Sequence, residues 1–222
     1  MIECAYPNKH GRGIKVQIFE LFKNKNTDKK DVKQKSEVKV PPVDEELLSQ
    51  IANKTYPGLG IYVRDINLPK SLADKYIPDL IIREKAFTDA SNRVMGMVTT
   101  HRYLILSNHM ANLSTFEHGT NWGLHVANRD SHFKVLGTHT YKTHSNEEKT
   151  AIVLLHLPDD ESWKVYKNCA FSMDETVYKM AIERFENKCE MPPVAELTTQ
   201  EWLARCAFPI GMNDNGTLWE LE

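Results

Sequence analysis

The chain has 222 residues, of which 41% are hydrophobic and 26% are charged, an ordinary globular composition that is compatible with one packed domain over residues 1–222. Its 28 basic and 30 acidic side chains leave a formal net charge of -2, so no global field draws it onto nucleic acid or an anionic bilayer. No apolar run reaches the roughly 20 residues that span a membrane, and the first residues lack the basic and apolar regions of a secretory signal. We therefore expect a soluble, cytoplasmic protein.

The N-terminal segment is predicted to contain a strand followed by a mobile loop. Alternating apolar residues at positions 14–19 indicate the strand. Residues 23–40 are rich in lysine and poor in apolar side chains, so they cannot bury enough surface to offset the entropy of ordering. The lysines from Lys23 to Lys39 attract phosphates, but no arginine or aromatic residue is interleaved, which makes nucleic acid the less favoured partner.

Helical and strand patterns alternate up to residue 107. Asp44 is predicted to cap a short amphipathic helix, and residues 60–66 alternate as a strand does. Residues 71–76 predict a helical turn, and residues 80–90 are predicted to continue as a helix. Residues 94–107 are β-rich and apolar at both ends, so they form either one long strand or, as we favour, a hairpin that turns near His101.

A second hairpin is predicted over residues 122–135. Large apolar side chains occupy alternate positions from Trp122 to Val126 and again at Phe133 and Val135. A turn at Arg129 and Asp130 would put these side chains on one face of the hairpin, whereas a register shift by one residue would mix the two faces.

The C-terminal part changes from strand to helix. Residues 151–157 form a continuous apolar run typical of a buried strand, Asp160 is a helix cap, and capping boxes at residues 172–175 and 198–201 predict two further helices. The predicted fold class is therefore α+β, with a central, largely antiparallel sheet over about residues 60–157 and C-terminal helices packed on one face.

Histidine is concentrated in the predicted sheet, since eight of the nine histidines lie between His101 and His156. In the predicted hairpin, His125, His132 and Lys134 share the face away from Trp122. Imidazole is both a metal ligand and a proton carrier, so this face is the candidate site. The binding residues predicted from this pattern are His125, His132, Lys134, Arg129 and His101, and the candidate ligands of a divalent metal are His125, His132 and His109.

Complete catalytic motifs are missing from the sequence. It contains no HExxH, no phosphate-binding GxxxxGK[ST] loop, no GxGxxG and no GxSxG elbow, and its four cysteines are spaced as free thiols. The favoured interpretation is an intracellular, non-catalytic protein that binds a protein or small-molecule partner through the histidine-rich face. The alternative is a metal-assisted or acid-base hydrolase of a phosphate or glycosidic substrate that uses the histidines of residues 101–156.

Overall fold

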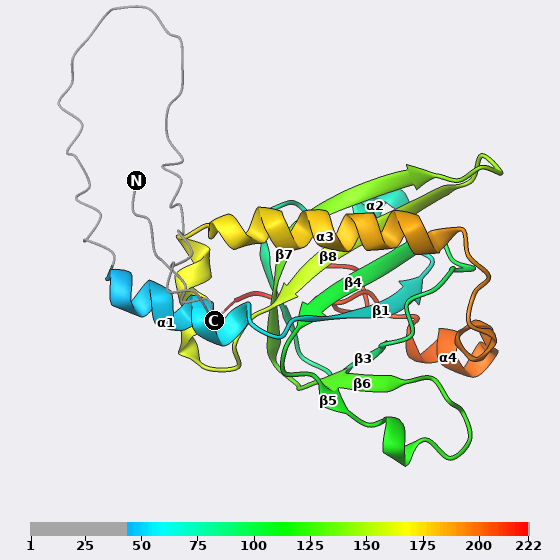
Figure 1. Cartoon of the computed structure of the whole chain (residues 1–222), viewed down its shortest axis with the longest axis horizontal. Coiled ribbons are helices and arrows are strands. Elements are labelled where there is room, and N and C mark those ends of the chain that lie inside the picture. Colours follow the sequence, from blue (N-terminus) through cyan, green and yellow to red (C-terminus); the bar gives the residue numbers. More distant parts are fainter. Residues whose placement is uncertain (1–43, 222) are drawn as a thin grey trace, which may run out of the picture.

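The computed structural model describes residues 44–221 (Figure 1), so the predicted strand at 14–19 and the predicted loop at 23–40 lie outside the described residues. Within the described part, an eight-stranded sheet has the order β2-β7-β8-β4-β1-β3-β6-β5. Every neighbouring pair is antiparallel except β4 and β8, which are parallel. The strands are β1 (Gly60–Ile66), β2 (Ile81–Glu84), β3 (Thr88–Ser91), β4 (His101–Ser107), β5 (Ala111–Asn112), β6 (Leu124–Ala127), β7 (Ser131–Lys142) and β8 (Glu148–His156).

The sheet is strongly curved because two short connections join strands from its opposite ends. Residues 85–87 connect β2 to β3, and residues 128–130 connect β6 to β7. Each pair is five strands apart in the sheet order, a separation of about 24 Å in a flat sheet. Four peptide units reach at most about 15 Å, so the two ends of the sheet must bend toward each other.

This curvature creates an inner and an outer apolar core. Leu104 and Leu106 of β4 face the outer core, whereas Tyr103 and Ile105 face the inner core. Strand β8 alternates in the same way, which explains why residues 103–106 and 151–155 are continuous apolar runs. The inner core also receives side chains from strands near both ends of the sheet, namely Ile82, Ala90, Ala127 and Phe133.

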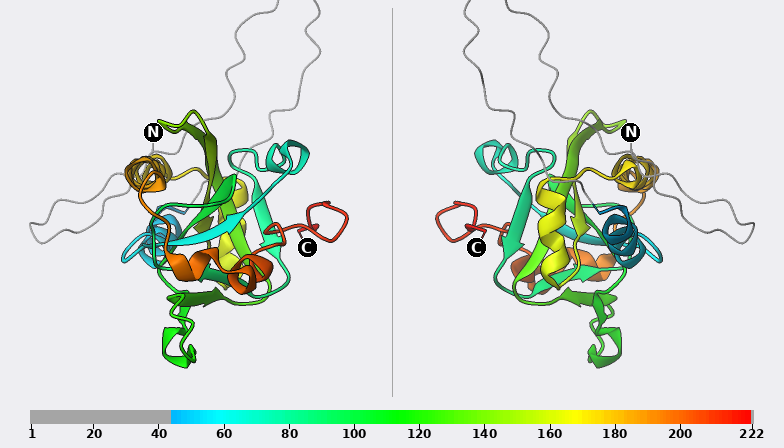
Figure 2. Two further views of the ribbon diagram at one scale, coloured as in Figure 1. Left: turned by 90° about the vertical axis from the view of Figure 1, so that its right-hand side faces the viewer. Right: turned by 90° about the vertical axis from the view of Figure 1, so that its left-hand side faces the viewer.

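Helices cover the outer core. Helix α1 (Glu45–Thr55) begins at Asp44, whose carboxylate accepts hydrogen bonds from two backbone N–H groups of the first turn. Helix α3 (Ser172–Cys189) crosses β7, β8 and β4 and buries Ala181, Phe185 and Cys189 against them (Figure 1). The C-terminal segment and α3 lie on opposite sides of the sheet (Figure 2). The remaining helices are α2 (Lys70–Ala73), α4 (Gln200–Arg205), and the 3-10 turns η1 (Ser114–Phe116), η2 (Glu161–Lys167) and η3 (Ala195–Thr198).

The predicted fold class is confirmed: the described chain is α+β, with a mostly antiparallel sheet over residues 60–156. The predicted helix at 44–56, strands at 60–66 and 151–157, and helices near 172 and 198 all form. No helix among residues 44–221 combines the length and apolar character that a membrane crossing requires.

Three local predictions are wrong. Residues 80–90 form β2 and β3 rather than a helix, and residues 94–107 contain a strand only from His101 onward. The predicted hairpin at 122–135 does not form, because β6 pairs with β3 and β5 while β7 pairs with β2 and β8. Trp122 lies outside any strand and packs on Trp202 of α4.

Candidate ligand pocket

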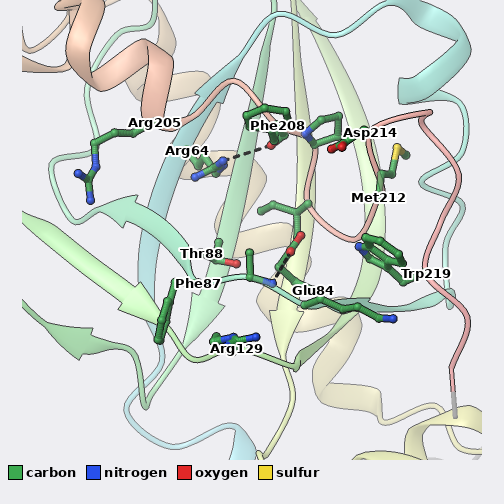
Figure 3. Close-up of a pocket in the computed structure, with 14 residues that line it drawn as sticks. Arg64, Glu84, Phe87, Thr88, Arg129, Arg205, Phe208, Met212, Asp214 and Trp219 are labelled. Atoms are coloured by element: carbon green, nitrogen blue, oxygen red, sulfur yellow. Dashed lines mark hydrogen bonds between the residues drawn. The ribbon is translucent and has the colours of Figure 1, made fainter.

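A pocket of about 570 Å³ opens where the two ends of the curved sheet approach each other. Its walls come from Arg64 of β1, from the β2–β3 connection at 84–88, and from Arg129 in the β6–β7 connection. Residues 205–219 of the C-terminal segment complete the lining. Figure 3 shows Glu84 between two groups of lining residues, with Arg64 and Phe208 on one side and Phe87 and Arg129 on the other. The site therefore depends on the curvature of the sheet.

Arg64 is a buried cation that lies beside the pocket. Its side chain enters from β1, and its two terminal nitrogens donate to the carbonyls of Asp89, at 3.0 Å, and Phe208, at 3.2 Å (Figure 3). These bonds fix the guanidinium group, but neither partner neutralises its charge. A guanidinium group held only by neutral carbonyls can still form a charge-assisted bond to an anionic group of a ligand.

Two polar atoms of the pocket lining have no hydrogen-bond partner. They are Arg64 Nε and the Thr88 hydroxyl, and both are buried. Among the described residues the only other such side-chain atom is His156 Nε2. A buried polar group without a partner costs about 1–3 kcal/mol, so each of these two atoms at the pocket requires an explanation.

Glu84 is a carboxylate held at the centre of this pocket. One of its oxygens accepts a hydrogen bond from Ala86 N at 2.8 Å, and the other accepts one from Gly211 N at 2.7 Å. Gly211 has a φ of 78°, and a Cβ at this position would lie 2.9 Å from Ile82 Cβ. The sequence therefore needs glycine here so that the C-terminal segment can approach β2 and orient the carboxylate.

Basic and aromatic side chains surround the opening. Arg129 is exposed, Arg205 lies 2.8 Å from Asp89, and the Lys85 ammonium lies 4.4 Å from the centre of the Trp219 ring. Phe87 and Phe208 expose 61% and 65% of their surface, which is unusual for phenylalanine. The opening thus combines positive charge with exposed aromatic rings.

The structure separates the residues of the predicted histidine face. His125 is buried against Tyr62, with ring centres 4.8 Å apart, while His132 stacks on Trp163 at 3.9 Å. Lys134 is 1% exposed and lies within 3.0 Å of the carboxylates of Asp79 and Asp174, so it is a buried structural cation. His132 and Lys134 are alternate residues of β7 and stay on one face, but β6 does not pair with β7, so His125 is not beside them.

His101 and Arg129 are also apart from these residues. His101 lines a separate depression beside Thr100, whereas Arg129 lines the pocket described above. The roles in partner binding and metal binding that the sequence suggested for individual residues stay predictions. For His132, burial lowers the pKa from 6.5 to about 4, with the nearby Arg83 acting in the same direction.

One set of described residues has the composition of a metal site. His109, His156 and Asp159 each offer one ligand atom, and these atoms lie within 4.8 Å of one another. Burial lowers the pKa of both imidazoles, although Asp159 and the Leu157 backbone oppose this effect at His109. Of the predicted metal ligands His125, His132 and His109, the set contains His109 alone.

Sequence reasoning missed most of the pocket. Arg64 follows three apolar residues within a strand and Thr88 falls in a segment predicted to be helical, so neither position indicated a site. The exposed Phe87 and Phe208 carry the available signal, since each adjoins alanine and a polar or proline residue rather than an apolar run. Only the folded sheet brings these segments together.

Comparison with known proteins gives no family for the chain, since no family model and no curated protein sequence matches it. Its fold partly resembles solved structures of bacterial toxins and effectors. The type III effector XopAI from Xanthomonas axonopodis pv. citri is one of them. The match covers 51% of the present chain and 47% of the XopAI chain, with 17% identity and a TM-score of 0.38. The enzymatic component C2-I of the C2-toxin from Clostridium botulinum matches 55% of this chain and 38% of its own, with 15% identity and a TM-score of 0.39.

A third similar structure is the ADP-ribosylating toxin BECa from C. perfringens, determined with NADH. It matches 51% of this chain and 35% of its own, with 12% identity and a TM-score of 0.35. The chain thus spans half or less of the length of each of these three proteins. These TM-scores and sequence identities describe a partial likeness in fold and do not by themselves assign an activity.

The expected function is wrong. A non-catalytic protein binding through a histidine-rich sheet face requires a face that the strand order does not produce. The comparisons do not confirm the alternative, a hydrolase that acts through the histidines at 101–156. Two of the solved structures of partly similar fold are named as enzymatic or ADP-ribosylating proteins.

Proposed function

We propose that the chain is an enzyme that uses a nucleotide-type substrate, with phosphate and a heteroaromatic ring, bound in the pocket between the two ends of the sheet. The observation that supports this most is the pair of buried, unpartnered atoms, Arg64 Nε and Thr88 Oγ1, at a pocket lined by further basic groups. The residues of the pocket, rather than the likeness to solved toxins, support the proposal.

The phosphate part of the ligand would contact Arg64 and Thr88. Phosphate oxygens accept hydrogen bonds from guanidinium and hydroxyl groups, and charge-assisted bonds of this kind are about twice as strong as neutral ones. Arg64 is already oriented by two backbone carbonyls, so little side-chain entropy is lost when the ligand binds. Arg129 and Lys85 add positive charge at the opening.

The ring of the ligand would contact the exposed aromatic residues. Phe87, Phe208 and Trp219 line the same pocket, and flat side chains provide stacking surfaces for a nucleobase worth about 1–3 kcal/mol per base. Inorganic anions alone would leave these rings without a role, which is why we favour a nucleotide over phosphate.

Glu84 is the residue to which we assign the catalytic role. Its carboxylate is fixed by two backbone N–H groups at the centre of the pocket (Figure 3). A fixed carboxylate stabilises positive charge that develops on a sugar when the bond to its leaving group breaks. NAD is the first substrate to test, because it combines two phosphates, two heteroaromatic rings and a cationic leaving group attached to a sugar.

The experiment is calorimetric titration of the full chain with NAD, ADP and inorganic pyrophosphate, followed by measurement of nicotinamide release. Arg129→Glu should weaken nucleotide binding at least tenfold, because it reverses an exposed charge that lines the pocket. Arg184→Glu, at an exposed arginine on α3, is the matched control and should bind as the parent does.

Two results would contradict the proposal. The assignment of this pocket as the nucleotide-binding site is wrong if no nucleotide binds. It is also wrong if the Arg129→Glu and Thr88→Val variants bind nucleotides with the affinity of the parent. The enzymatic part is wrong if NAD and other nucleotides bind but none is consumed, with or without added cell extract as a source of acceptors. We further propose that the acceptor is a protein or small molecule in the cytoplasm, which fractionation of expressing cells would test.

A further inference from the structure

His109, His156 and Asp159 converge at the ends of two parallel strands, and none of the three lines the ligand pocket. His156 is the last residue of β8, and His109 follows two residues after the end of β4. Asp159 precedes η2. Asp159 Oδ1 lies 3.9 Å from His109 Nε2 and 3.8 Å from His156 Nε2, and the two imidazole rings are stacked with centres 4.0 Å apart.

His156 Nε2 is aimed into this group but has no hydrogen-bond partner. The residue is 1% exposed, and the 3.8 Å to Asp159 is too long for a hydrogen bond. A buried imidazole nitrogen without a partner is unusual and requires an explanation.

The other nitrogen of each ring is already engaged. His109 Nδ1 lies 2.8 Å from the Asn108 amide oxygen, which can only accept, so Nδ1 carries the proton and Nε2 carries a lone pair. The Asn108 amide is itself oriented by the bonds that its nitrogen donates to the Lys54 and Pro57 carbonyls. His156 Nδ1 lies 2.9 Å from the Ser107 hydroxyl, and a proton on Nδ1 satisfies this contact.

With Nδ1 protonated on both rings, two imidazole nitrogens and one carboxylate oxygen face one another as lone-pair donors. A cation between these three atoms would stabilise this arrangement. Ligating histidines commonly donate their second ring nitrogen to a nearby acceptor, as His109 does here.

We propose that His109, His156 and Asp159 bind one divalent transition-metal ion, with zinc as the ion best matched to two imidazoles and a carboxylate, and with a fourth position open to water. In a tetrahedral zinc site, ligand atoms about 2.0–2.1 Å from the metal lie about 3.3 Å apart. The stacked rings, whose centres are now 4.0 Å apart, must therefore open so that both Nε2 atoms point at one ion, and the two carboxylate distances must shorten by about half an ångström.

Asp159 can make this adjustment. Its side chain is 46% exposed, and its other oxygen accepts a hydrogen bond of 3.3 Å from Asn128, which leaves Oδ1 for the metal. The bound ion would connect the segment after β4 to the segment after β8. We assign it a structural role, because it would fix two connections that the sheet alone does not join.

The test uses full-length protein without a histidine tag, dialysed against zinc and then against metal-free buffer. Inductively coupled plasma mass spectrometry should find about one zinc ion per chain, and removal by a chelator should lower the melting temperature. Asp159→Asn and His109→Ala should lose the metal, whereas His118→Ala, at an exposed histidine, should retain it.

Asp159 and His109 are both exposed, so circular dichroism should show that these variants fold. Cobalt substitution should give visible absorption bands of a tetrahedral nitrogen and oxygen site. The proposal is overturned if the parent retains no metal, if Asp159→Asn and His109→Ala bind as much as the parent, or if cobalt shows a thiolate charge-transfer band, which would place the ion on cysteine.

Discussion

Arg102 and Asp65 form a buried, bidentate ion pair between the neighbouring strands β4 and β1. The distances are 2.6 Å from Nε to Oδ1 and 2.8 Å from the terminal nitrogen to Oδ2, with the side chains 0% and 6% exposed. Arg102 also donates to the carbonyls of Met95 and Gly96. One guanidinium group therefore holds both the strand pair and the irregular segment before β4.

Removing the carboxylate should leave Arg102 as a buried charge without its counter-ion. Asp65→Asn is expected to reduce the free energy of unfolding by about 3–5 kcal/mol, measured by urea denaturation. The matched control is Asp74→Asn, which breaks the exposed pair between Lys70 and Asp74 and should cost less than about 1 kcal/mol. Equal effects of the two substitutions would mean that the buried pair contributes no more than a surface pair.

Stability should depend on pH through His132. Burial, assisted by the Arg83 cation, lowers the pKa of His132 to about 4 in the folded protein, against 6.5 for the ordinary side chain. The unfolded chain therefore binds more protons between pH 6.5 and pH 4, so this contribution is complete above pH 6.5 and is lost as the pH falls toward 4. His132→Asn should make the free energy of unfolding less dependent on pH in this window, whereas His118→Asn should not.

Thr88→Val should separate ligand binding from folding. The buried hydroxyl of Thr88 has no partner, so its replacement by a methyl group should leave stability unchanged or raise it by about 1 kcal/mol. Nucleotide affinity should nevertheless decrease, because the ligand loses a donor. A variant that is both less stable and weaker in binding would indicate that the hydroxyl has a structural partner instead.

Gly211→Ala tests how closely the C-terminal segment must approach β2. Alanine would be strained at a φ of 78°, and its Cβ would meet Ile82. Gly58 has a similar φ of 74°, but a methyl carbon there would have no atom within 4 Å, so Gly58→Ala measures the strain of about 1–2 kcal/mol alone. Gly211→Ala should cost clearly more in thermal denaturation. It should also weaken nucleotide binding, because the displaced backbone N–H group would no longer orient Glu84.

Local sequence patterns predicted those elements whose residues interact mainly with their own neighbours. Asp44 caps α1 as expected, and the apolar run at 151–157 becomes a strand buried on both faces. The pattern failed at Trp122 to Val135, where a register argument assumed that adjacent strands pair. Here β6 and β7 follow each other in the chain but lie near opposite ends of the sheet, which no local pattern specifies.

The pocket could not be predicted for the same reason. Arg64, Thr88, Arg129 and Phe208 are distant in sequence, and they meet only because the sheet is curved. Of the predicted metal ligands, His109 lies in the cluster with His156 and Asp159, and metal binding by that cluster stays a prediction. His125 and His132 were assigned to the same face on the strength of a hairpin that does not exist.

The two three-residue connections act as tethers of fixed length. Residues 85–87 and 128–130 limit how far β2 and β7 can move from β3 and β6, and Arg83 reinforces the second tether through its 2.9 Å contact with Asp130. The length of these two connections thus limits the width of the pocket. Natural or engineered insertions at either connection would admit a bulkier molecule, while the lining residues on the strands, such as Arg64 and Glu84, stayed the same.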